Sequence, residues 1–96
     1  MSSHSQNKLN SNKVSKVTTL QIPNTSILDY INASGSAFGA MGFNNSSDAP
    51  STDEYAVFWF GSKNRVSVIA HQYPGTIIYI RDIFNNKWHN NWSILH

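Results

Sequence analysis

The sequence predicts an all-β domain: a small antiparallel meander that folds into a compact sandwich- or barrel-like knob. Three β-prone apolar runs fill the second half of the 96-residue chain, at residues 55–60, 65–70 and 76–81. Short turns join these runs, which favours antiparallel pairing of neighbouring strands. No segment longer than a turn or two carries the apolar period of a helix.

The first half of the chain contributes less regular structure. Residues 1–16 are rich in Ser, Asn and Lys, and we expect a disordered leader or a linker there, with residues 17–96 as one β domain. Residues 17–22 form a short β-prone run that ends at Pro23. Ser26 is a candidate cap for Ile27–Ile31, which is long enough for about one helical turn.

Residues 33–43 hold three glycines among small side chains. This density suits a bent or bulged strand, or the close approach of another backbone, and a flexible loop is the alternative. Residues 44–53 are polar, contain Pro50 and predict a long exposed loop.

The remaining strands follow in order. Residues 55–60 are apolar on both faces, which predicts a central strand covered on both sides. Residues 65–70 alternate, with Val66 and Val68 on one side. After the strand at 76–81, Asn85-Asn86 turns the chain into a last strand that begins at Trp88. On one continuous strand, Trp88, Trp92 and Ile94 would share a face.

Composition excludes several classes of protein. From Val17 onward four basic residues face five acidic ones, a balance of −1, so the folded part lacks the clustered cations of a nucleic-acid binder. No stretch approaches the ~20 apolar residues needed to cross a bilayer, so we expect no membrane insertion. Cysteine is absent and the histidines lack ligand spacing, so we expect no metal and no other cofactor.

Catalysis also has little support in the sequence. Asp53-Glu54 and Asp82 are the acids nearest to the strands, and adjacent side chains on a strand point apart. A glycosidase needs two carboxylates that face one sugar bond. No Gly-x-Ser-x-Gly nucleophile turn occurs either. We therefore expect a protein that is not an enzyme.

The order of several short motifs is more informative than any one of them. They are Ile27-Leu28-Asp29-Tyr30, Gly35, Asp48-Ala49-Pro50, Arg65-Val66-Ser67-Val68, Ile78-Tyr79-Ile80-Arg81, and Trp88 with Trp92 and Ile94. In this order, over residues 27–95, they resemble the pyocin-knob-like domain that ends many bacteriophage tail fibres, neck appendages and receptor-binding proteins. Two features depart from that pattern: the turn here is Asn85-Asn86-Lys87 without glycine, and the Gly35 region is unusually rich in small residues.

The resemblance implies a trimeric β knob that caps a phage tail fibre and attaches to the bacterial surface. The implied partners are two further copies of the chain, other tail or fibre proteins, and a surface polysaccharide or teichoic acid. The implied location is the virion tail, outside the cell after release. The N-terminus shows no apolar run suited to a signal peptide, so synthesis in the host cytoplasm is expected. One alternative is a monomeric carbohydrate-binding module of a cell-wall-acting protein, and another is a domain that only completes the fibre.

Two sets of residues are candidates for these roles. The candidates for packing in the core or between protomers are Phe58, Phe60, Ile78, Ile80, Trp88, Trp92 and Ile94. The candidates for ligand binding are Tyr79, Arg81, Trp88 and Trp92. A tryptophan can stack on a sugar ring or pack as core, and Arg81 can bind phosphate, pair with an acid or lie over a tryptophan. Exposed loops, above all residues 44–53, are further candidates for contact with a saccharide.

Overall fold

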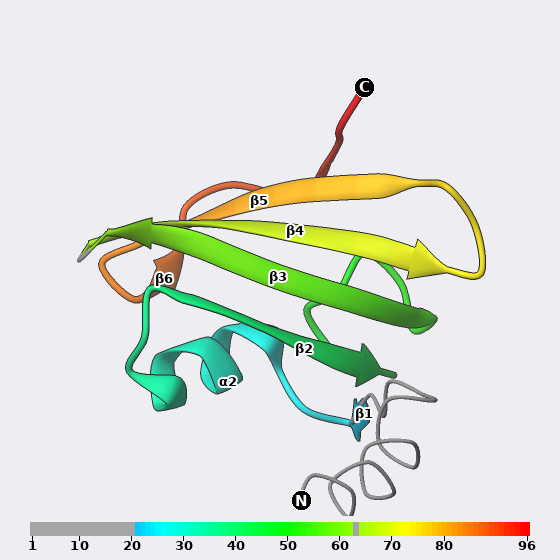
Figure 1. Cartoon of the computed structure of the whole chain (residues 1–96), viewed down its shortest axis with the longest axis horizontal. Coiled ribbons are helices and arrows are strands. Elements are labelled where there is room, and N and C mark those ends of the chain that lie inside the picture. The colour runs from blue at the N-terminus through cyan, green and yellow to red at the C-terminus, as the bar shows by residue number, and fades with distance from the viewer. Residues whose placement is uncertain (1–20, 63) are drawn as a thin grey trace, which may run out of the picture.

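The computed structural model describes residues 21–62 and 64–96. The predicted leader at 1–16 and the first part of the predicted run at 17–22 lie outside these ranges. The elements, in chain order, are β1 (Gln21–Pro23), α2 (Ile27–Ser34), β2 (Phe38–Asn44), β3 (Glu54–Ser62), β4 (Arg65–Tyr73), β5 (Ile78–Phe84), β6 (Lys87–Trp88) and β7 (Ser93–Ile94) (Figure 1).

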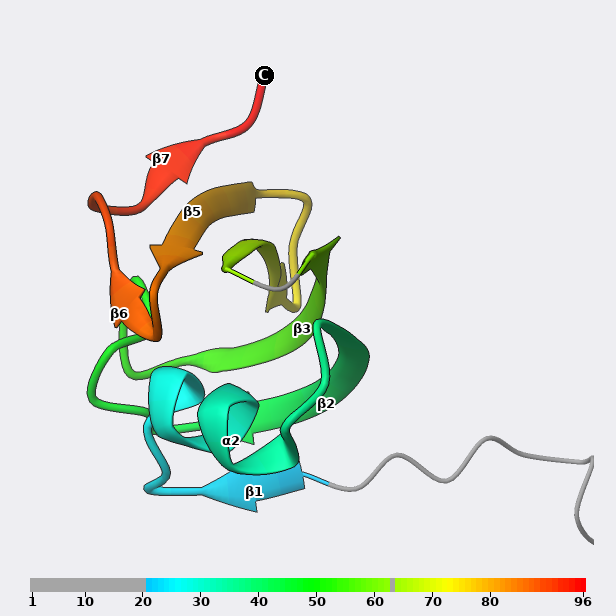
Figure 2. The ribbon, with the colours of Figure 1, turned by 90° about the vertical axis from the view of Figure 1, so that its left-hand side faces the viewer.

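One curled sheet contains all the described strands and forms a half-barrel (Figure 2). The strands β2 to β6 pair with their chain neighbours in antiparallel fashion, and β7 pairs with β5 as well. This part is the predicted meander, and the all-β fold class is confirmed. The edge strand β1 differs, because it pairs with β2 in parallel. The helix α2 connects these two strands, and a crossover of this kind brings the chain back in the same direction.

The helix is longer than the single turn expected. Ser26 caps it as predicted: its Oγ accepts a hydrogen bond from the backbone N–H of Asp29 at 3.2 Å. The helix then ends at Gly35, which adopts a left-handed conformation (φ 66°) that glycine enters without steric cost. Ile27 and Ile31, four residues apart, both face the sheet and are buried. In the part of the chain that the structure describes, no helix is long and apolar enough to span a membrane.

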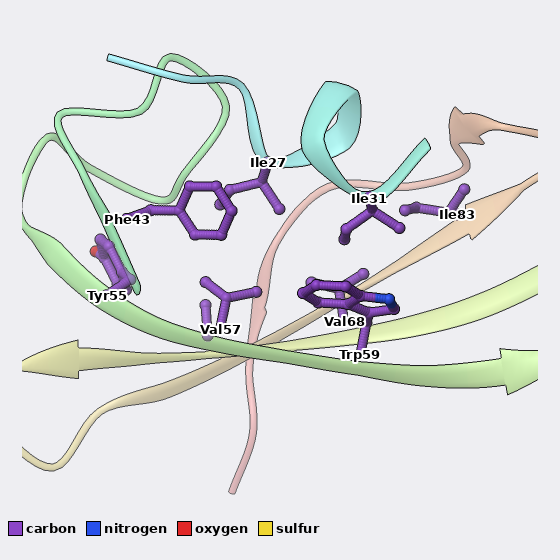
Figure 3. Close-up of a cluster of buried hydrophobic side chains, with 9 residues drawn as sticks. Ile27, Ile31, Phe43, Tyr55, Val57, Trp59, Val68 and Ile83 are labelled. Carbon is purple, nitrogen blue, oxygen red and sulfur yellow. The ribbon is translucent and has the colours of Figure 1, made fainter. Parts of the chain in front are cut away.

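The hydrophobic core lies between α2 and the inner face of the sheet. Ile27 and Ile31 point from the helix toward Phe43, Val57 and Trp59 on the strands (Figure 3). Tyr30 adds edge-on contacts to the rings of Phe43 and Trp59 at centroid distances of 5.5 and 6.1 Å. Val66 and Val68 share the core-facing side of β4, as the alternation predicted.

The opposite face of the sheet is open, which corrects the prediction for β3. In that strand only Tyr55, Val57 and Trp59 are buried, while Phe58 and Phe60 point outward and are 45% and 42% exposed. The register aligns further outward apolar side chains beside them on β2, β4 and β5. We call this set the outer face: Phe38, Phe58, Phe60, Ile69, Ile78 and Ile80.

Gly39 makes room for the indole of Trp59, its cross-strand partner. A Cβ at position 39 would lie 2.4 Å from Cζ2 of that ring. The Trp59 ring cannot retreat easily, because its Nε1 donates to the carbonyl of Ser36 at 3.0 Å. The close approach at Gly39 is therefore made by a buried side chain, the Trp59 indole, and not by the backbone that the sequence predicted.

Gly39→Ala is expected to lower the free energy of unfolding by about 2 kcal/mol, because the added methyl overfills a packed core. Ala40→Val is the matched control, since Ala40 is exposed on the next position of the same strand and should change stability by less than about 0.5 kcal/mol. Denaturant unfolding measures both. Equal, small effects would show that the Trp59 contact is not tight.

Candidate functional site

The C-terminal segment folds as two short strands, which corrects the prediction of one continuous strand. Trp88 pairs with Ile83 in β6, and Ile94 pairs with Tyr79 in β7, so the chain meets β5 twice. The residues between them leave the sheet. The two tryptophans nevertheless meet, with ring centroids 5.4 Å apart.

Asparagines shape both changes of direction. The predicted turn at Asn85-Asn86 is confirmed, and both residues have positive φ (52° and 66°), as a two-residue hairpin turn requires. Further on, the side chain of Asn90 makes the hydrogen bonds to Asp82 that the backbone of a neighbouring strand would otherwise make. Its Oδ1 accepts from the Asp82 N–H at 2.9 Å and its Nδ2 donates to the Asp82 carboxylate at 3.0 Å. The Asp82 N–H of β5 is thereby hydrogen-bonded at the point where the residues between β6 and β7 leave the sheet.

The carboxylate of Asp48 joins the helix to the closing segment. It accepts hydrogen bonds from the backbone N–H groups of Ile27 (2.7 Å) and Leu28 (3.0 Å) at the start of α2. The hydroxyls of Ser26 (2.8 Å) and Ser46 (2.9 Å) also donate to it. A carboxylate is favoured here, because a helix N-terminus presents unpaired N–H groups and positive dipole charge.

The indole N–H groups of Trp88 and Trp92 both donate hydrogen bonds to Asp48. Trp88 Nε1 donates to the carboxylate of Asp48 at 3.0 Å, and Trp92 Nε1 donates to its backbone carbonyl at 2.7 Å. The two tryptophans are half-buried and pack against the core. Asp48 therefore ties three segments together: the start of α2, the loop at 44–53 and the C-terminal strands.

The surroundings of Asp48 change its pKa in two opposed ways. Burial raises the pKa, and the hydrogen bonds from Leu28, Ile27, Ser26 and Ser46 lower it. The hydrogen bonds prevail, so the pKa of Asp48 lies below its ordinary value and the group is ionised at neutral pH.

Arg81 covers the tryptophan pair. Its guanidinium carbon lies 4.2 Å from the ring centroid of Trp88 and 5.7 Å from that of Trp92. Its Nε donates to the carbonyl of Asn90 at 2.6 Å. Burial lowers the pKa of Arg81, and the nearby charge of Asp48 raises it, with a net lowering. Of the possibilities that the sequence left open for Arg81, the structure shows packing over tryptophan.

Three of the four predicted ligand residues thus form one cluster, which we call the closing cluster: Arg81, Trp88 and Trp92. Tyr79 lies two positions before Arg81 on the same side of β5 and contacts the ring of Tyr55 edge-on at 6.1 Å. Because Arg81 occupies one face of Trp88 and both indole N–H groups are bonded internally, the cluster offers little open ring surface to a sugar. Its contacts attach the C-terminal segment to β5 and to Asp48.

The predicted packing residues divide into two groups. Trp88 and Trp92 pack on the core side of the sheet, whereas Phe58, Phe60, Ile78 and Ile80 all lie on the outer face. Ile94 is 50% exposed. Within a single chain Phe58 and Phe60 are not covered, because the described elements supply no second layer above the outer face. The interpretation as an interface between protomers stays a prediction.

The loop at 44–53 is less open than expected, and it contains the residue that sequence reasoning missed. Ser46 is only 2% exposed, and its one hydroxyl proton is shared between the Asp48 carboxylate and the carbonyl of Thr25, whose oxygen lies 2.6 Å from its Oγ. Asp48 was recognised only as part of a motif, and its role depends on partners 20 to 44 positions away in the sequence. The Asp-x-Pro pattern after two serines was the one available signal.

The acids among residues 21–62 and 64–96 form no cluster suited to a metal ion. No group of three potential ligands gathers there. Asp53 accepts hydrogen bonds from Ser51 (2.9 Å) and Gln72 (2.8 Å), and Asp82 is bonded to Asn90. Glu54 accepts from the side chain of Gln21. Each of these acids is held by neutral partners.

Comparison with known protein families, with curated proteins and with solved structures found no match. The likeness to the pyocin-knob-like domain rests on the sequence motifs alone.

Proposed function

We propose that this chain is a non-enzymatic tip domain of a bacteriophage tail fibre or receptor-binding protein. In this role it forms a homotrimer, caps the fibre and attaches to saccharide on the bacterial surface. The motif order within residues 27–95 supports the proposal, as does the β half-barrel fold.

The observation that carries the proposal is the outer face. Phe38, Phe58 and Phe60 lie side by side on adjacent strands and are 70%, 45% and 42% exposed, with isoleucines on the next two strands. The rings of Phe58 and Phe60 are 5.4 Å apart, so they form a continuous apolar surface. Contiguous apolar patches on a sheet mark interaction sites, and copies of the same chain are the partner that the motifs imply.

The division of roles within the domain follows from this arrangement. The closing cluster uses its polar atoms internally, so it holds the fold together. Contact with saccharide then falls to exposed loops and to grooves between protomers. Three equivalent weak sites on one fibre tip bind a repetitive polymer far more tightly than one site does.

Adsorption to bacterial cell walls tests the function. The whole chain is expected to adsorb to purified walls of its host, and removal of teichoic acid or of the other wall polysaccharide should identify the polymer bound. Phe58→Glu, which breaks the outer face, should reduce adsorption by at least about tenfold through lost multivalency. An absence of adsorption to walls from a broad panel of bacteria would contradict an attachment role. Release of reducing sugar from the walls would contradict a non-enzymatic role.

A further inference from the structure

A cavity of about 250 Å³ lies at the end of α2, and its lining shares no residue with the outer face or the closing cluster. Its floor is aliphatic and is formed by Ile31 of α2, Val66 of β4 and Ile83 of β5. Ile31 and Ile83 belong to the core and are 4% and 3% exposed. The cavity is slightly smaller than the ~300 Å³ at which pockets for drug-sized ligands begin, and it suits a group of the size of one sugar ring.

The rim of this cavity is formed by three asparagines and a serine: Asn32, Asn64, Asn86 and Ser36. These residues come from the end of α2, the β3–β4 turn, the β5–β6 turn and the α2–β2 connection, in that order. The backbone N–H of Asn85 donates to the carbonyl of Asn64 at 3.0 Å. Asn32 Nδ2 donates to the carbonyl of Asn86 at 3.0 Å. Within the described residues, the side-chain amides of Asn64 and Asn86 make no hydrogen bond.

The chemistry of the lining selects one class of ligand. A carboxamide donates and accepts at once, which matches the vicinal hydroxyls or the acetamido group of a sugar. Aliphatic floor atoms match the C–H face of a pyranose or an acetamido methyl. None of the residues that line the cavity in the structure is charged. An anionic group such as a polymer phosphate gains nothing here, since binding it calls for guanidinium or ammonium groups.

We infer that this cavity binds one neutral sugar unit, a hexose or an N-acetylhexosamine, of a surface glycan. The inference deepens the proposed function by naming a ligand class and a site, and it rests on that function for the source of the glycan. Asn64 and Asn86 hydrogen-bond the sugar, Asn32 positions Asn86, and the aliphatic floor contacts the ring.

The test is titration of the isotopically labelled whole chain with N-acetylglucosamine, glucose and inorganic phosphate, followed by NMR. At millimolar sugar, at least one of the two sugars is expected to shift the side-chain amides of Asn64 and Asn86, and phosphate to shift neither. Ala37→Phe, which fills the cavity from its lining, should weaken the response at least about tenfold. Asn64→Ala should also weaken it, without crowding the fold. Asn91→Ala, an exposed amide outside the lining, is the matched control and should bind as the original chain does.

The outcomes separate this inference from the proposed function. Sugar-induced shifts confined to the closing cluster, or none for either sugar, would overturn the cavity as a sugar site. Wall adsorption that persists in the Ala37→Phe variant after its sugar response is lost would also overturn the cavity as the attachment site, while the attachment function stands. Sugar binding at the cavity in a chain that adsorbs to no wall would support the site and contradict the function.

Discussion

Replacing Asp48 with alanine is expected to destabilise the domain by about 3 kcal/mol, since hydrogen bonds to a charged group contribute roughly 1.5–3 kcal/mol each and are partly replaced by water. The variant leaves two helix N–H groups, the Ser26 hydroxyl and the Trp88 indole without their acceptor. In a domain of this size the midpoint of thermal unfolding should fall by about 15 °C. Calorimetry or circular dichroism measures the shift.

The charge of Asp48 gives this prediction a pH signature. The folded pKa lies below that of the unfolded chain, which is about 3.9. The contribution of the ionised group is therefore complete above that pH, and it is lost as the pH falls through the folded value. Asp48→Asn should be less stable than the original chain at neutral pH, and the difference should shrink below about pH 4.

Asp53→Ala is the control for Asp48. Asp53 is also an acid of the 44–53 loop with hydrogen-bonded partners, but it is exposed and bonded to Ser51 and Gln72 at the surface. Its removal should cost less than about 1 kcal/mol. If the Asp48 and Asp53 variants unfold alike, the junction of the helix with the C-terminal strands does not depend on the Asp48 carboxylate.

Phe58→Glu is expected to separate the protomers while leaving each one folded. Phe58 sits at the middle of the outer face, between Ala40 on β2 and Ile69 on β4. Burying a carboxylate there against apolar side chains of a second copy costs several kcal/mol, so association should weaken by at least about a hundredfold. The side chain is already 45% exposed in the single chain, so the fold should tolerate the change.

Ile77→Glu is the matched control for this interface. Ile77 is 42% exposed, close to Phe58 in exposure, but it lies in the β4–β5 connection and outside the outer face. Its replacement adds the same charge and should leave the sedimentation profile unchanged. Equal dissociation of both variants would point to a general charge effect, and dissociation of neither would show that the outer face is not the contact.

Local signals predicted much of the fold. Alternation identified the core side of β4, where Val66 and Val68 face inward, and the Asn85-Asn86 pair identified a hairpin turn. Ser26 was found as a helix cap. Each of these features depends on residues within a few positions of one another, which is why a single sequence reveals them.

The errors share a different physical origin. An aromatic strand such as 55–60 looks the same whether its second face is covered by its own chain or by another, because the pattern records apolarity and not the partner. The break after Trp88 depends on the Asn90 side chain, which takes the place of a strand neighbour for Asp82. The site at Asp48 depends on contacts across the whole domain. The parallel pairing of β1 with β2 could not be predicted, because the sequence did not show that α2 is long enough to act as a crossover.

The oligomeric mass of the whole chain in solution tests the central claim most directly. Sedimentation equilibrium over a range of concentrations should give three times the chain mass of 10.8 kDa, and the Phe58→Glu chain should give one. A monomeric mass for the original chain at all concentrations would contradict the proposal of a trimeric tip domain. If such a monomer also bound glycans, it would instead be a carbohydrate-binding module.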